Sequence, residues 1–161
     1  MADGRWPIAG KLVASPSMPR FSDTVTAKAS VKKSWETLQD AGVWGALLGA
    51  AEISDIEVED GLLKSCGWKA KIGGSELTGT MKVAESEPRE RMLMKIRAAE
   101  WRGKIEMTLE PEHQRKTRLH ARLELNADGF TALLALPIVS SVIGRHLPDR
   151  MAELVEFVES A

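Results

Sequence analysis

Residues 77–96 read LTGTMKVAESEPRERMLMKI and contain two predicted β-strands joined by a turn at Pro88-Arg89. In the first strand, the residues from Leu77 to Val83 alternate between apolar or small and polar side chains. In the second strand, Met92, Met94 and Ile96 alternate with residues on the opposite parity. A period of two is typical of a strand that buries one face. The short turn between them predicts antiparallel pairing.

The same period continues on both sides of this stretch. Asp60-Gly61 and Gly73-Gly74 are turn signals between strands. The pattern predicts five further strands, at 21–29, 53–59, 62–72, 103–109 and 119–125. The polar segment 111–116 is predicted to be a turn between the last two. The sequence therefore predicts an antiparallel sheet of about seven strands, with one solvent-exposed face and one buried face.

Two short helices are predicted between the first and second strands. Ser30 is a suitable N-cap for a helix that is expected to end at Asp40 and Gly42. A second helix, from Val43 to Ala50, is expected to close near Gly49.

A long helix is predicted at the C-terminus, after the last strand. Its apolar stripe has helical spacing and consists of Leu147, Met151, Leu154 and Val158. Pro137 and Pro148 are expected to start, kink or break this helix.

Length and composition indicate one soluble domain. The chain has 161 residues, 43% of them hydrophobic, with 22 basic and 23 acidic residues. The resulting formal net charge of −1 argues against a nucleic-acid-binding protein. Residues 1–20 are rich in proline and glycine and are predicted to be a flexible N-terminal extension, with the domain at 21–161. The single Cys66 and the lack of an apolar leader lead us to expect a cytoplasmic protein without disulfides.

A sheet of this width with one apolar face must bury that face against other elements, and one long helix is available to cover it. A strongly curved α+β arrangement, with the sheet wrapped around the C-terminal helix, satisfies this requirement. One helix is too narrow to fill such a sheet, so we expect an apolar cavity between the helix and the sheet.

Four segments carry a resemblance to a known superfamily. They are VTAKASVKKSWETL at 25–38, the central run at 77–96, and RLHARLEL at 118–125 together with the helix ending LPDRMAELVEFV. Their order resembles the START-like (SRPBCC) helix-grip superfamily over roughly residues 21–159. Within the superfamily, the sequence is most similar to the bacterial polyketide cyclase/dehydrase and lipid-transport group, or to the subunit-G-like proteins linked to carbon monoxide dehydrogenase. The resemblance implies a pocket for a hydrophobic ligand without an obligatory cofactor, and its members range from enzymes to carriers.

The candidate ligand-binding residues are the inward-facing positions of the strands and of the last helix. They are Trp68, Met81, Met92, Met94, Ile96, Trp101, Ile105, Met107, Leu119, Leu123, Leu147 and Met151. The alternative interpretation is that these side chains simply fill a core. Trp68 and Trp101 could stack on a flat or ring-shaped ligand, and methionines suit an adaptable wall. The leading hypothesis is therefore binding, transport or sequestration of a lipid or a polyketide-like ring compound.

Two other function classes stay open. A cyclase or dehydratase needs a polar group in the pocket, for which Asp23 is the candidate general base; Lys64 and Cys66 share parities that are also expected to face inward. The uncharged segment 129–144 is expected to cover the cavity mouth, or to contact a membrane or a partner enzyme without spanning the membrane. The three histidines are too scattered to form a metal site, although His146 could reach the cavity mouth.

Overall fold

A computed structural model describes residues 20–72 and 74–161. One sheet of seven antiparallel strands forms the body of the protein, in the order β1-β7-β6-β5-β4-β3-β2. The predicted N-terminal extension, apart from Arg20, lies outside the described residues. The strands are β1 (Arg20–Ala27), β2 (Ala50–Glu59), β3 (Leu62–Ile72), β4 (Ser75–Glu87), β5 (Arg91–Ala98), β6 (Trp101–His113) and β7 (Lys116–Ala127).

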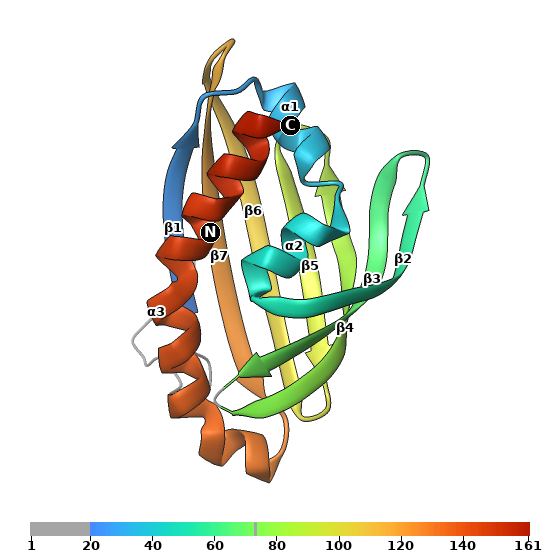
Figure 1. Cartoon of the computed structure of the whole chain (residues 1–161), viewed down its shortest axis with the longest axis vertical. Helices are drawn as coiled ribbons and strands as arrows, with labels where there is room; N and C mark the ends of the chain where they lie inside the picture. Colours follow the sequence, from blue (N-terminus) through green and yellow to red (C-terminus); the bar gives the residue numbers. More distant parts are fainter. Residues whose placement is uncertain (1–19, 73) are drawn as a thin grey trace.

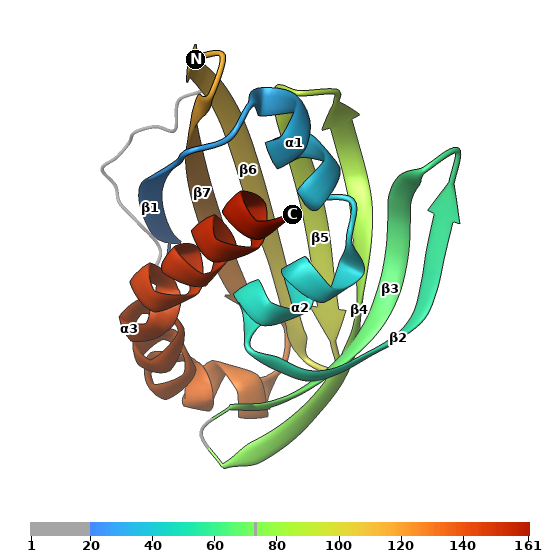
Figure 2. The same cartoon turned by 45° about the horizontal axis from the view of Figure 1, so that its top comes forward.

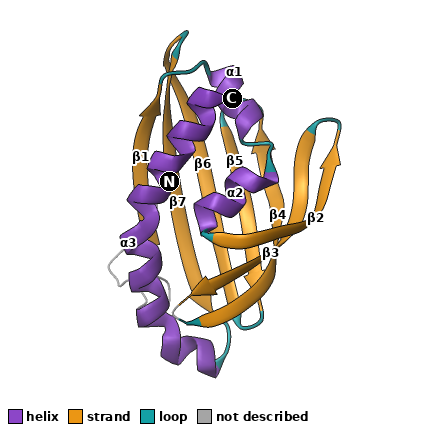
Figure 3. Ribbon diagram, viewed as in Figure 1, coloured by secondary structure: helices purple, strands orange, loops and turns teal. Residues whose placement is uncertain are grey.

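Three helices lie on the concave side of this sheet (Figures 1 and 2). They are α1 (Val31–Thr37), α2 (Ala41–Leu48) and α3 (Phe130–Ser160). Figure 3 shows the long α3 running along the sheet beside β1, with α1 and α2 on its other side. The predicted α+β helix-grip fold is confirmed, including the number of strands and the two short helices.

The helix ends follow local capping. Ser30 begins α1 as predicted, because its hydroxyl oxygen accepts a hydrogen bond from the Lys33 amide at 3.1 Å. The expectation that Asp40 and Gly42 end the first helix is wrong, since the Asp40 carboxylate accepts from the Gly42 amide at 2.8 Å and so begins α2. Gly49 ends α2 in the left-handed conformation with φ 73°, as expected for a C-terminal glycine.

The turns between strands confirm the sequence signals with one difference. Asp60 and Gly61 have φ values of 55° and 77°, which the tight turn after β2 requires. The predicted turn at 111–116 is shorter in the structure, because Pro111 still pairs with Thr117 within β6 and β7. A register shift between Pro111 and His113 accommodates the proline at this point of the ladder.

The C-terminal helix is continuous through Pro137 and Pro148, and Figure 2 shows it bent between its first turns and the rest. Its first turn is fixed by Glu100 in the β5–β6 turn, whose carboxylate accepts from the Ala132 amide at 3.0 Å. This side chain replaces the missing cap at Gly129. The bend lets one helix cover both the end and the middle of the sheet.

Candidate ligand-binding site

The twelve predicted ligand-binding residues all pack on the side of the sheet that faces the helices. All but Ile96 and Trp101, which are partly exposed, are buried. They share one hydrophobic cluster with side chains of α1 and α2, such as Trp35, Trp44 and Leu47. The alternation in the sequence therefore assigned their face correctly, and most of them belong to the packed core.

Trp68 is held firmly within this core. Its ring covers Gly79 on β4, where an added Cβ would lie 2.7 Å from a ring carbon. Its indole N–H donates to the carbonyl of Thr80 at 3.1 Å. Trp101 packs against this core and also against a second cluster, beneath the first half of α3, built on Leu125, Leu136 and Val139. The predicted stacking role of both tryptophans remains a prediction.

A groove opens between α2 and α3, beside the end of β3 and Leu123 of β7, with a cavity volume of about 70 Å³. We call it the α2–α3 groove. Its lining comprises Leu47, Leu48, Gly49, Lys71, Leu123, Val142, Ile143, His146, Leu147 and Arg150. Two of the predicted residues, Leu123 and Leu147, are among them. The location between helices and sheet is the one that the sequence predicts for a cavity.

Half of the residues that line the groove were not predicted from the sequence. Leu47 and Leu48 lie on a helix of eight residues to which no ligand role was assigned. Lys71 and Arg150 are charged residues on a strand and a helix, and no motif marks them. His146, which was expected to reach the cavity mouth, does line the groove, as do Val142 and Ile143 of the segment 129–144 that was expected to cover it.

Two larger hollows, each of about 510 Å³, lie elsewhere and differ in character. One lies on the outer face of the sheet, over Thr24, Thr108 and His120. The other lies between α1 and the end of α3, beside Lys33 and Phe157. Their linings are mostly polar or charged, whereas the walls of the α2–α3 groove are mostly apolar. An apolar ligand therefore fits the groove better.

Asp23 lies on the inward parity of β1, opposite Ala121, and is half-buried. Within residues 20–72 and 74–161, no hydrogen bond or ion pair is recorded for its carboxylate. It does not line the α2–α3 groove. Its role as a general base remains a prediction.

The expectation that Lys64 faces inward is wrong. Glu57 and Val58 of β2 pair with Ser65 and Leu63 of β3, so Lys64 is the extra residue of a bulge. The bulge interrupts the alternation, and the Lys64 side chain is exposed while the thiol of Cys66 is buried.

Burial raises the pKa of the Cys66 thiol above its usual value. The thiolate is the reactive form, so we expect the folded protein to react slowly with Ellman's reagent at pH 8 and to react fully once it is unfolded in guanidinium chloride. Absorbance of the released thiolate measures both rates. Rapid labelling of the folded protein would show that the thiol is accessible and ionised.

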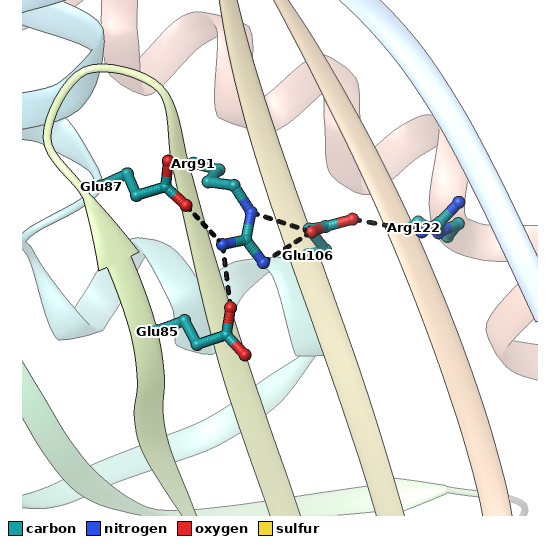
Figure 4. A network of polar contacts seen from close by, with 5 residues as sticks. All are labelled: Glu85, Glu87, Arg91, Glu106 and Arg122. Atoms are coloured by element: carbon teal, nitrogen blue, oxygen red, sulfur yellow. Dashed lines mark hydrogen bonds and ion pairs between the residues drawn. The ribbon is translucent and has the colours of Figure 1, made fainter. Parts of the chain in front are cut away.

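The outer face of the sheet carries a network of charges (Figure 4). Arg91 bonds to Glu85 at 2.9 Å and to Glu87 at 2.8 Å, and it reaches Glu106 at 2.9 Å. Glu106 also contacts Arg122 at 3.3 Å. These carboxylates hold the pKa of the Arg91 guanidinium above its usual range. Opposite charges alternate across the strands, as on a solvated face.

The remaining histidines make local contacts. His120 bonds to the Thr24 hydroxyl at 2.6 Å on the outer face, and His113 accepts from the Arg115 amide at 3.1 Å. In the part of the chain that the structure describes, no group of three or more histidine, cysteine or acidic residues is placed to hold a metal ion.

The first half of α3 presents an apolar surface to solvent. Phe130, Leu133, Leu134 and Ile138 are exposed, Phe130 by 76%. Over Phe130–Ser160 the helix is long and apolar enough to cross a membrane by length and composition. Its second half, however, packs Met151, Leu154 and Val158 into the core of the domain.

The profile of a protein family, Activator of Hsp90 ATPase homolog 1-like protein (AHSA1), matches residues 24–156. The match covers the sheet and all three helices. The chain belongs to the AHSA1 family. This family match, together with the seven-stranded helix-grip fold, confirms the predicted resemblance to the START-like superfamily.

Solved structures with the same fold include TTHA0849 from Thermus thermophilus, at 15% identity and a TM-score of 0.70, covering 87% of this chain and 97% of that one. The START superfamily protein from Mycobacterium smegmatis has 15% identity and a TM-score of 0.66. The match covers 88% of this chain and 97% of the Mycobacterium smegmatis chain. The Zhui aromatase/cyclase from a Streptomyces species has 15% identity and a TM-score of 0.62. The match covers 89% of this chain and 92% of the aromatase/cyclase chain. At these identities, the similarity to the solved structures shows only that this chain has the same fold. No curated protein matches the chain.

Proposed function

We propose that this AHSA1-family chain binds a hydrophobic small molecule, of the lipid or polyketide-like ring class, in the α2–α3 groove. One observation carries the proposal. An apolar groove lies between two helices of the grip, and Leu47, Leu123 and Leu147 connect it to the core. Removing apolar ligand surface from water there contributes roughly 25 cal/mol per Å².

The groove must widen to take such a ligand. Its volume of about 70 Å³ is below the roughly 300 Å³ at which pockets for drug-sized ligands begin. Five methionines, Met81, Met92, Met94, Met107 and Met151, lie in the core cluster that the groove adjoins. Methionine side chains are unbranched and change rotamer readily, so the ligand can displace them at low cost.

We propose binding as the primary role, with a reaction of the cyclase or dehydratase type as the alternative. The buried polar side chains of the described residues are Ser34, Thr37 and Thr117. Each donates its hydroxyl proton to a backbone carbonyl, at 2.8–2.9 Å. These hydroxyls satisfy backbone carbonyls and do not line the groove, so an acid or base for a cyclase or dehydratase would have to come from His146 or Lys71, which do line it.

The exposed apolar face of α3 favours contact with a membrane or a partner as a second role. Cytoplasmic location is also part of the proposal, in keeping with a single buried thiol that forms no disulfide.

A variant that narrows the groove tests the binding proposal. Val142 lines the groove from α3, while the neighbouring Ser141 is exposed and does not line it. We expect Val142→Trp to weaken binding of the neutral fluorophore 1-aminoanthracene about tenfold or more, because the indole occupies ligand space. Ser141→Trp is the matched control and should bind like the unaltered chain. Fluorescence titration measures both affinities, and equal affinities for the two variants would contradict this site.

A further inference from the structure

Three basic side chains meet at the α2–α3 groove. Lys71 comes from the end of β3, and His146 and Arg150 come from α3. The other lining residues are Gly49 and apolar side chains, so the groove lining contains no carboxylate. The site therefore combines an apolar wall with a local excess of positive charge.

The position of Arg150 depends on a glycine. Gly49 lies in the left-handed region, and a Cβ added to it would be 2.7 Å from Nη2 of Arg150. The missing side chain thus leaves the space in which the guanidinium lies against the end of α2. The fold places this cation at the groove instead of leaving it free in solvent.

Two carboxylates next to this cluster, those of Glu153 and Glu76, leave hydrogen-bond donors of the cluster available. Glu153 contacts Nη1 of Arg150 at 3.5 Å, and half of the Glu153 side chain is exposed. Glu76 is opposite Lys71 in the register of β3 and β4. Neither acidic residue lines the groove. Nη2 of Arg150 forms no hydrogen bond with any residue of 20–72 or 74–161.

We propose that the ligand of this groove is an amphipathic anion, an apolar body carrying a carboxylate or a similar acidic group. This inference rests on the proposed function and adds the chemical class of the ligand. The apolar body contacts Leu47, Leu123 and Leu147, and the anionic group accepts hydrogen bonds from Lys71 and Arg150. Such charge-assisted hydrogen bonds are stronger than those between neutral groups. A neutral analogue of the same ligand cannot form them and should bind more weakly.

A structural role for Arg150 makes a different prediction. A cation beside the C-terminal end of α2 also stabilises the helix through its dipole. In that case substitution lowers the melting temperature and leaves ligand affinity unchanged. The test therefore measures both quantities.

The experiment compares octanoate with 1-octanol by isothermal titration calorimetry on the full chain. We expect octanoate to bind about tenfold more tightly than 1-octanol. Arg150→Gln and Lys71→Gln should each remove most of this preference, by lowering the affinity for octanoate more than the affinity for 1-octanol. Arg150→Lys, which keeps the charge, should retain part of it. Arg145→Gln is the matched control, because Arg145 is an exposed cation of α3 that does not line the groove.

The outcomes separate this inference from the proposed function. Equal binding of octanoate and 1-octanol, or a preference that survives Arg150→Gln and Lys71→Gln, would overturn the anion site. The proposed function would still stand if 1-aminoanthracene bound in the groove. A fall in melting temperature without a change in octanoate affinity would likewise assign Arg150 to structure alone. Loss of the octanoate preference in both variants, with Arg145→Gln unaffected, supports the inference.

Discussion

Replacing Gly79 with valine is expected to lower the free energy of unfolding by more than about 3 kcal/mol, or to prevent folding. A Cβ at this position would collide with the backbone carbonyl of Arg97 on β5. It would also lie 2.7 Å from the Trp68 ring and 2.9 Å from the Cβ of Ala98. The backbone carbonyl cannot move aside without breaking the pairing of β4 and β5.

Chemical denaturation followed by circular dichroism measures this loss. Gly79→Ala provides a smaller change if the valine variant does not fold. Gly103→Ala is the control, because its nearest neighbour, the carbonyl of Glu124, would be 3.1 Å away and the cost should be about 1 kcal/mol or less. A Gly79→Val protein as stable as the unaltered chain would show that β4 and Trp68 are not packed as described.

Replacing Trp44 with alanine is expected to cost about 3–5 kcal/mol of stability. Trp44 on α2 is fully buried, and its indole N–H donates to the carbonyl of Leu38 at 2.8 Å. The substitution leaves a cavity beneath α2 and an unpaired carbonyl. Because α2 supplies Leu47 and Leu48 to the groove, binding of 1-aminoanthracene should fall as well.

Two further variants separate these contributions. Trp44→Phe keeps most of the apolar volume and loses the hydrogen bond, so about 1–2 kcal/mol is expected. Phe130→Ala removes an exposed aromatic ring and should change stability by less than about 0.5 kcal/mol. If Trp44→Ala and Phe130→Ala unfold at the same denaturant concentration, the core role of Trp44 is disproved.

The sequence is sufficient to predict the sheet, because a strand with one buried face has apolar side chains at every second position. Met92 and Met94 on β5, and Leu119 and Leu123 on β7, alternate strictly and are all buried. The alternation fails where the chain departs from a regular ladder. Lys64 is the extra residue of a bulge, so counting by parity sends it to the wrong face.

The binding site is harder to predict for a physical reason. Core residues and cavity-lining residues obey the same pattern, so Met107 and Leu123 look alike although only Leu123 lines the groove. The groove also depends on how α2 lies against α3, which is set by tertiary packing such as that of Arg150 on Gly49. No local pattern encodes that contact.

Methyl NMR of the chain during titration with 1-aminoanthracene tests the central claim, that ligand enters between α2 and α3. We predict that the methyl signals of Leu48, Leu123 and Leu147 shift in a saturable manner, followed by that of Met151 in the core behind them. The methyls of Ile56 and Val58, exposed on β2, should stay unchanged. Shifts confined to β2, or to the exposed Leu134 and Ile138 of α3, with the groove methyls unmoved, would contradict the account.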